Sequence, residues 1–129
     1  MLVDTHCHLN LQQFDGDREA AIDRARQAGV ERIVVIGIDR VTNREVVALA
    51  ERHPGIYAAV GYHPTSANEF NPQTLDELRE YLAHPRVVAV GEIGLDYYWD
   101  EQPRELQAEV FQAQLALAVE THKPIVVHI

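Results

Sequence analysis

Long hydrophobic runs, pairs of cysteines and glycine-rich phosphate loops are all missing from this sequence of 129 residues. Its apolar stretches, Ile33 to Ile36 among them, span only a few residues, whereas a membrane helix needs about 20. The single cysteine, Cys7, cannot form an internal disulfide, and no basic segment precedes an apolar one at the N-terminus. These absences predict a cytoplasmic protein that does not enter a membrane.

Positive charge is also scarce. The chain has 11 lysines and arginines against 20 acidic residues, and its formal net charge is −9. This balance argues against a broad nucleic-acid-binding surface, but it is compatible with an enzyme that holds a phosphate locally through metal ions. Hydrophobic residues make up 47% of the chain, which is typical of a globular protein, and the length predicts a single domain over residues 1–129.

Short segments rich in β-branched residues alternate with helical segments along the chain. We expect strands at 2–8, 32–38, 57–61, 87–91 and 124–128. We expect four helices, at 17–28, 42–50, 72–82 and 103–121. Thr42 is the expected cap of the second helix and Asn71 that of the third. The strand segments are apolar on both faces, as in a buried parallel sheet, and the alternation predicts crossover helices.

Two parallel architectures fit this alternation, an open doubly wound sheet and a (β/α)₈ barrel. The open dinucleotide-binding sheet lacks its glycine fingerprint, because Asn10, Leu11 and Gln12 follow the first strand. A complete barrel needs about 250 residues. We therefore predict an α/β fold of the TIM-type (β/α)₈ barrel class, of which this chain supplies roughly the first five strands and four helices.

Residues that can bind metals stand at the ends of four expected strands: His6 and His8, His63, Glu92, and His128. Active sites of parallel barrels are built at that end of the strands. Two residues apart on a strand, His6 and His8 point to the same face and converge, while Cys7 between them faces the other way as a small buried filler. A packed pair of core histidines is the alternative, but its desolvation is costly, so the pair predicts metal ligands.

The other strand-end residues extend this site. Glu92 could bridge two cations, with a capping or surface glutamate as the alternative. His128 is a ligand candidate because its position is equivalent to the other strand ends. We interpret His63 and Glu92 as catalytic residues, His63 through a substrate phosphate, although ordering of the Tyr-His-Pro turn explains His63 equally well. Asp4 and Asp96 are candidates for orienting the ligands or contacting the substrate.

Four segments, in this order along the chain, resemble signature blocks of the TatD-type nucleases within the amidohydrolase superfamily: Val3–Asn10, Val60–Pro64, Val90–Tyr98 and Lys123–His128. The resemblance implies a TIM-type barrel that hydrolyses phosphodiester bonds of DNA with water activated by two divalent metal ions. Mg²⁺ is the first expectation, with Mn²⁺ and Zn²⁺ as alternatives. His6 and His8 would bind one ion, and Glu92 would bridge to a second that His128 helps to hold.

The same resemblance implies a later histidine and a later aspartate that complete the site, and neither lies within these 129 residues. We therefore expect this chain to depend on a missing C-terminal half or to self-associate, with little activity alone. Its expected partner is a DNA or nucleotide substrate. One alternative is another hydrolase of the superfamily, acting on an amide, lactone or phosphotriester. Such enzymes often carry a carbamylated lysine where this chain has Glu92. A non-catalytic metal-binding fragment is the other alternative.

Overall fold

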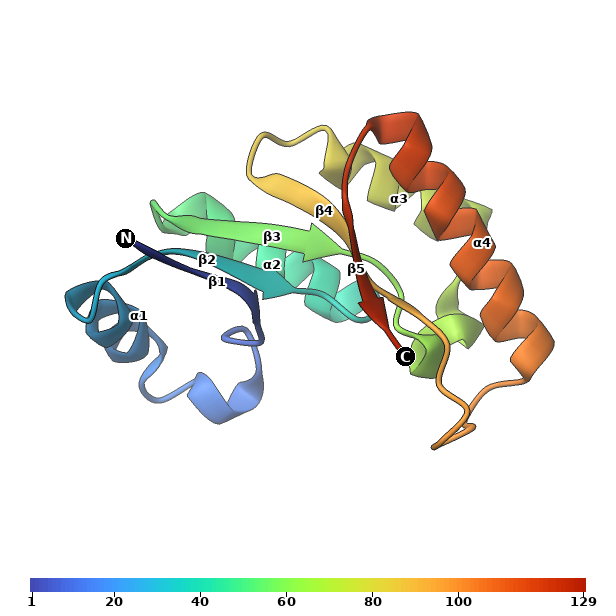
Figure 1. Cartoon of the computed structure of the whole chain (residues 1–129), viewed down its shortest axis with the longest axis horizontal. Coiled ribbons are helices and arrows are strands. Elements are labelled where there is room, and N and C mark those ends of the chain that lie inside the picture. Colours follow the sequence, from blue (N-terminus) through green and yellow to red (C-terminus); the bar gives the residue numbers. More distant parts are fainter.

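The computed structural model describes residues 1–129, whose strands form one parallel five-stranded sheet (Figure 1). The strands pair in chain order, β1-β2-β3-β4-β5, because each crossover places the next strand beside the previous one. Their bounds are β1 Leu2–Cys7, β2 Val30–Ile36, β3 Ile56–Val60, β4 Val87–Gly94 and β5 Ile125–His128. The predicted parallel α/β arrangement is confirmed as half of a barrel.

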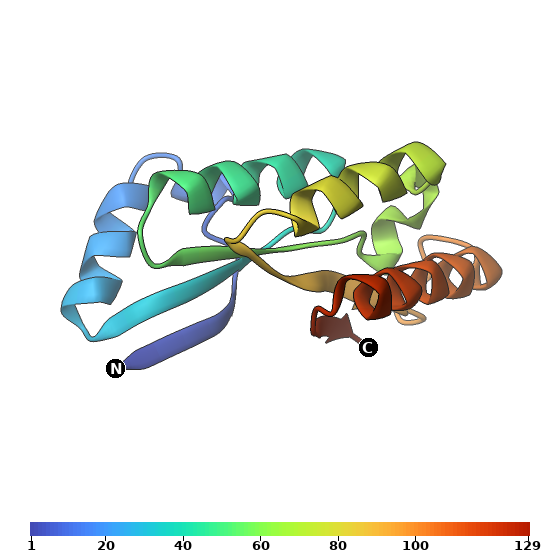
Figure 2. The same cartoon turned by 90° about the horizontal axis from the view of Figure 1, so that it is seen from above.

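Four helices connect the strands: α1 Arg18–Gln27, α2 Arg40–Arg52, α3 Pro72–Leu82 and α4 Arg104–Thr121. Two short 3₁₀ helices, η1 Gln12–Phe14 and η2 Pro64–Glu69, follow β1 and β3. In Figure 2, α1, α2 and α3 lie on one side of the sheet, and the opposite face carries no helix at its centre. None of the helices combines the length and the hydrophobicity that a membrane span requires.

The main core lies between the sheet and its helices, because successive strand residues point to opposite faces. Val35, Ala58 and Val60 face the helices, where they join Val46 of α2 and Leu78 of α3 in a buried cluster of 21 residues. The alternate strand residues form a smaller cluster of Ile36, Ala59 and Ala89 on the open face. All three of these side chains are at most 5% exposed although no helix packs on them.

Helix ends follow local side-chain chemistry, with one correction to the sequence-based prediction. The predicted cap of α3 is confirmed, since the Asn71 side chain accepts from the Thr74 amide and Pro72 begins the helix. The predicted cap of α2 at Thr42 is wrong. Asp39 caps this helix, and Thr42 is the third helical residue, whose hydroxyl accepts from the Asp39 amide.

The fourth strand is longer than predicted and continues to Gly94, so Glu92 lies inside β4 rather than after it. Two glycines allow this extension, because β4 runs very close to β5. A Cβ atom at Gly91 would overlap Val126, and one at Gly94 would overlap the carbonyl oxygen of His128. The close approach brings the side chains of Glu92 and His128 together.

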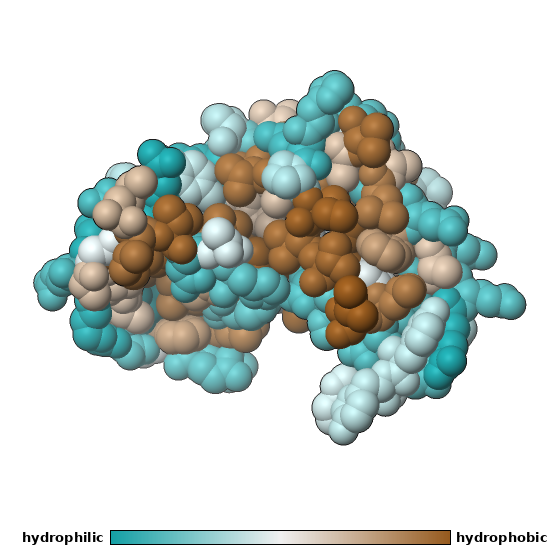
Figure 3. Space-filling view, viewed as in Figure 1, coloured by the Kyte–Doolittle hydropathy of each residue, from teal (hydrophilic) through white to brown (hydrophobic).

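Burial on both faces is observed for the central strands but not for β1 and β5. Leu2, Val3, Ile125 and Val127 are all at least 40% exposed. Each of these two strands has a neighbour on one side only, and no helix covers the centre of the sheet face opposite α1, α2 and α3. The space-filling view of Figure 3 shows the resulting hydrophobic patches between hydrophilic regions.

Candidate metal centre

Side chains at the ends of four strands or in the loops just after them meet at the carboxyl edge of the sheet and form two overlapping groups. His6, His8 and Glu92 make the first group, and His63, Glu92 and His128 make the second. Within each group the candidate ligand atoms lie within 4.8 Å of one another. The structure therefore brings together all five residues that the sequence places at strand ends, with Glu92 common to both groups.

The carboxylate of Glu92 divides its two oxygens between the groups. Oε1 lies 3.2 Å from His6 Nε2 and 3.8 Å from His8 Nε2. Oε2 lies 2.9 Å from His128 Nδ1 and 3.6 Å from His63 Nε2. The residue is only 7% exposed, and its amide donates to the Gly37 carbonyl after β2. A buried carboxylate held in this way can contact two cations, one through each oxygen.

The hydrogen bonding of His8 suits a metal ligand. Its Nδ1 lies 3.2 Å from the carbonyl oxygen of Ile36, at the end of β2. Because a carbonyl can only accept, Nδ1 carries the proton of the neutral ring and Nε2 keeps its lone pair facing Glu92. Strand β2 thus contributes through its main chain although it offers no side chain. Cys7, as predicted, packs against the main core instead.

The hydrogen bonding of His63 suits a donor rather than a ligand. Its Nδ1 accepts from the amide of Thr65, so the neutral ring carries its proton on Nε2, the atom that faces Glu92. Burial lowers the pKa of His63, with Glu92 acting in the opposite direction, and the lowered pKa favours the neutral ring. Although His63 is near enough to be a ligand, its tautomer leaves no lone pair on Nε2 for a cation.

The ring of His128 lies between two carboxylates. Nδ1 is 2.9 Å from Glu92 Oε2, and Nε2 is 3.0 Å from Asp96 Oδ2. The other oxygen of Asp96 accepts from the backbone amide of Trp99 at 2.9 Å. This hydrogen bond, followed by that from His128, lowers the pKa of Asp96. An ionised Asp96 accepts the Nε2 proton of His128 and leaves Nδ1 free to bind a cation beside Glu92.

Asp4, the remaining candidate, lies outside the cluster. It is exposed, and its carboxylate accepts from the backbone amide of His6 at 3.1 Å. Its contact is therefore with the strand that carries His6 rather than with any imidazole of the centre.

Three buried amide side chains support the loops of the site, and none of them is among the residues predicted from the sequence. Gln107 and Gln114 of α4 each pair with both backbone groups of one residue, Asp96 and Tyr62 respectively. Asn43 of α2 pairs in the same way with Gly61. Their signal in the sequence is weak, since α4 carries several other polar residues and Asn43 lies between the polar residues Thr42 and Arg44.

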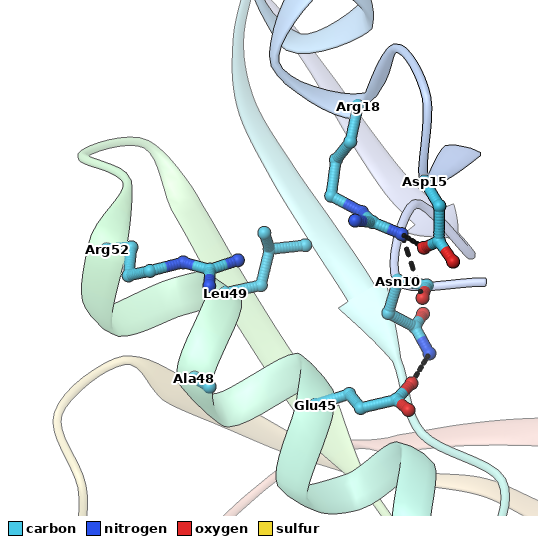
Figure 4. Close-up of a pocket in the computed structure, with 7 residues that line it drawn as sticks. All are labelled: Asn10, Asp15, Arg18, Glu45, Ala48, Leu49 and Arg52. Carbon is cyan, nitrogen blue, oxygen red and sulfur yellow. Dashed lines mark hydrogen bonds and ion pairs between the residues drawn. The ribbon is translucent and has the colours of Figure 1, made fainter. Parts of the chain in front are cut away.

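A further network fixes the loop that follows His8. The Arg18 guanidinium donates to the carbonyls of Leu9, Asn10 and Leu11 and to the Asp15 carboxylate. Asn10 in turn donates to Glu45 of α2 at 3.2 Å. Figure 4 shows these residues around a pocket between this loop and α2. Because Arg18 ties the loop to the start of α1 and Asn10 ties it to α2, the network holds the end of β1 in place.

Comparison with known proteins agrees with this geometry. A family model described as TatD related DNase matches residues 3–129. The chain belongs to this family. It is 48% identical over 128 residues to the metal-dependent hydrolase YabD of Bacillus subtilis, covering 99% of this chain and 50% of YabD.

Two further matches support the same family assignment. One, 37% identical, is the 3'-5' ssDNA/RNA exonuclease TatD of Erwinia tasmaniensis, with 98% of this chain and 49% of that protein covered. The other is a crystal structure of the TatD homologue YjjV from Escherichia coli, 40% identical, which superposes with a TM-score of 0.89 over 98% of this chain and 50% of YjjV. The chain spans about half the length of these relatives.

Proposed function

We propose that this TatD-family chain provides one half of a two-cation centre that hydrolyses phosphodiester bonds of DNA. The observation that carries the proposal is the divided carboxylate of Glu92, with one oxygen toward His6 and His8 and the other toward His128. A relative of this chain is named as an exonuclease of single-stranded DNA and RNA. A strand-four glutamate in place of a carbamylated lysine also favours a nuclease over an amidase or lactonase.

The donor set fits two divalent cations. His6, His8 and Glu92 Oε1 form the first set, and Glu92 Oε2 with His128 begins the second. When bound, such ions supply Lewis acidity and a hydroxide-like nucleophile near neutral pH. Three imidazoles beside one carboxylate favour Mn²⁺ or Zn²⁺ over Mg²⁺, which prefers oxygen ligands. Carboxylate and imidazoles are thus arranged to hold both cations beside a scissile phosphate.

His63 has a separate task in this proposal. Its Nε2 proton points into the centre, 3.6 Å from Glu92 Oε2. When a phosphodiester occupies the centre, the Nε2–H group of His63 can donate a hydrogen bond to a non-bridging oxygen. This hydrogen bond would stabilise the charge that develops there. Asp96 meanwhile holds the orientation of His128. Ligation and substrate contact are thus assigned to different histidines.

The first test is metal content, because it does not require a complete barrel. Calorimetric titration of the chain with Mn²⁺ should detect binding. Glu92→Gln should lower the Mn²⁺ affinity by more than the roughly 10- to 100-fold that is typical when a residue supporting a ligand is lost. Glu105→Gln, at an exposed position of α4, is the matched control and should bind like the wild type. Equal binding by Glu92→Gln would remove the bridging role.

The second test is hydrolysis. Residues 1–129 can be joined to the remaining half of YabD, the relative that is 48% identical. We expect this chimera to release nucleotides from single-stranded DNA in a reaction that a chelator abolishes and Mn²⁺ restores. Turnover of dihydropyrimidines or lactones, with none on DNA, would support the other hydrolase class and overturn the nuclease.

A further inference from the structure

Three consecutive aromatic residues, which we call the aromatic tip, occupy the loop between β4 and α4. Tyr97 is 45% exposed, Tyr98 is 85% exposed and Trp99 is 68% exposed. The loop extends away from the sheet at the lower right of Figure 1, and a pale lobe projects at the same place in Figure 3. Large aromatic surfaces left in water typically mark a binding site.

The loop that carries the aromatic tip is anchored at both of its ends. At its start, Asp96 is paired through both backbone groups with Gln107 of α4. At its end, the Gln102 carbonyl accepts from Gln107, and the Gln102 side chain reaches the Thr65 carbonyl at 3.4 Å. One side chain of α4 therefore fixes both ends, and the tip is presented on a defined turn.

The aromatic tip is also connected to the metal centre. The Trp99 amide donates to one oxygen of Asp96 at 2.9 Å, and the other oxygen of Asp96 lies 3.0 Å from His128 Nε2. Two contacts thus link the backbone of the tip to a candidate metal ligand. The loop that carries the aromatic tip therefore starts beside the centre, at a residue that contacts His128 directly.

Charge decides what kind of group the aromatic tip can hold. Glu101 is exposed, and Asp100 pairs at 3.3 Å with Arg104, whose guanidinium also lies 4.2 Å from the ring centroid of Tyr97. A phosphate at the tip would have to compete with the Asp100 carboxylate for this cation, so the tip is a poor phosphate clamp. Flat nucleobases carry no charge and stack on aromatic rings with little regard to sequence. Bases of this kind are available in single strands but not inside a duplex.

We propose that Trp99, with Tyr98 beside it, is a stacking platform for a nucleobase of single-stranded nucleic acid next to the scissile phosphate. The two rings lie edge to face with centroids 5.0 Å apart, so Tyr98 supports the orientation of Trp99. The platform rests on the proposed nuclease function for its ligand, but it binds a base without metal. Substrate affinity then comes from the base, whereas the cations act on the phosphate.

The chain is well suited to a direct test, because Trp99 is its only tryptophan. Oligothymidylate added to the 129-residue chain in the presence of a chelator should quench tryptophan fluorescence in a saturable manner. An abasic oligomer of the same length, which has the phosphates but no bases, should not quench, and a duplex should quench far less. Equal quenching by the abasic oligomer, or none by oligothymidylate, would overturn the platform.

Substitutions separate aromatic stacking from general hydrophobic contact. Measured by anisotropy of a labelled oligomer, Trp99→Leu should weaken binding by roughly 5- to 150-fold, the range for loss of one base stack, whereas Trp99→Phe should lose less. Val119→Ala, at an apolar side chain of α4 that is 76% exposed, should bind like the wild type. Equal affinities of Trp99→Leu and the wild type for the oligomer would contradict stacking. A shift of the tryptophan emission with protein concentration alone would also contradict it, because it would show that the tip contacts a second copy of the chain.

The two proposals fail in different ways. Quenching by oligothymidylate in a protein whose YabD chimera hydrolyses no nucleic acid would keep the platform and remove the nuclease. Chelator-sensitive DNA hydrolysis that is unchanged by Trp99→Leu, together with equal quenching by abasic and normal oligomers, would remove the platform and keep the nuclease.

Discussion

At the scale of single residues, the five strand-end side chains differ in their hydrogen bonds more than in their positions. His8 donates to a carbonyl through Nδ1, while His63 accepts an amide proton at the same atom. Opposite tautomers leave opposite groups facing Glu92, a lone pair in His8 and a proton in His63. Their distances from Glu92 alone would make both histidines metal ligands. The positions of the protons on the two rings assign only His8 to a cation.

This difference predicts different losses for the two histidines. His8→Ala should weaken Mn²⁺ binding to the chain, because a ligand is lost. His63→Ala should leave Mn²⁺ binding unchanged but should lower hydrolysis by the YabD chimera about 10²- to 10³-fold, the typical effect of removing one transition-state donor. Calorimetry and single-turnover rates measure the two effects separately. Reduced metal binding in His63→Ala would instead make His63 a ligand.

At the scale of secondary-structure elements, α4 determines much of the geometry of the centre without contributing a ligand. Gln107 and Gln114 lie on the buried side of this helix and are at most 1% exposed. Each replaces the hydrogen bonds that the backbone of Asp96 or Tyr62 would make in a sheet. Loops that leave the sheet are thereby kept in place beside it.

Gln114→Leu should therefore be strongly destabilising although it fills a similar volume. It leaves the buried amide and carbonyl of Tyr62 without partners, and each unpaired group costs about 1–3 kcal/mol. We expect the free energy of unfolding to fall by about 2–6 kcal/mol, measured by urea denaturation. Gln112→Leu, at an exposed position of the same helix, should change stability little. Equal stability of the two variants would show that the amide pair contributes nothing.

The sequence predicts the features that follow from periodicity, but not those that depend on contacts between distant segments. Because the carboxyl ends of parallel strands share one edge, the pattern of strands is enough to place His6, Glu92 and His128 together. It is not enough to reveal the buried role of Gln114, because nothing in the sequence distinguishes it from the exposed Gln112 of the same helix. The cap at Asp39 is hidden in the same way, since Thr42 fits the same motif three residues later.

At the scale of the whole molecule, the sheet has two free edges. Strands β1 and β5 each pair on one side only, and both expose apolar residues. Unpaired edges of this kind are templates for another chain. The relatives that match this chain are about twice as long, and in a closed barrel such edges do not exist. We therefore propose that the isolated chain pairs with a second copy or with a complementary half.

Association should be measurable directly. Light scattering coupled to size-exclusion chromatography should detect oligomers of the 129-residue chain that increase with concentration, with little DNA hydrolysis. Ile125→Lys places a charge on the free edge strand β5 and should shift the chain toward the monomer. Val41→Lys, at an exposed apolar residue of α2, should not. A wild-type chain that stays monomeric at every concentration and turns over DNA like the YabD chimera would contradict this expectation.

The pairing of strands in chain order also bears on how the chain folds during its synthesis. After β1, each strand pairs with the strand that was synthesised just before it. The sheet can thus grow in one direction as the chain leaves the ribosome, from β1 toward β5. Glu92 is in place one strand before His128 arrives, so the pocket for the first cation is assembled earlier than the pocket for the second. A chain that ends after α4 would contain His6, His8 and Glu92 but not His128.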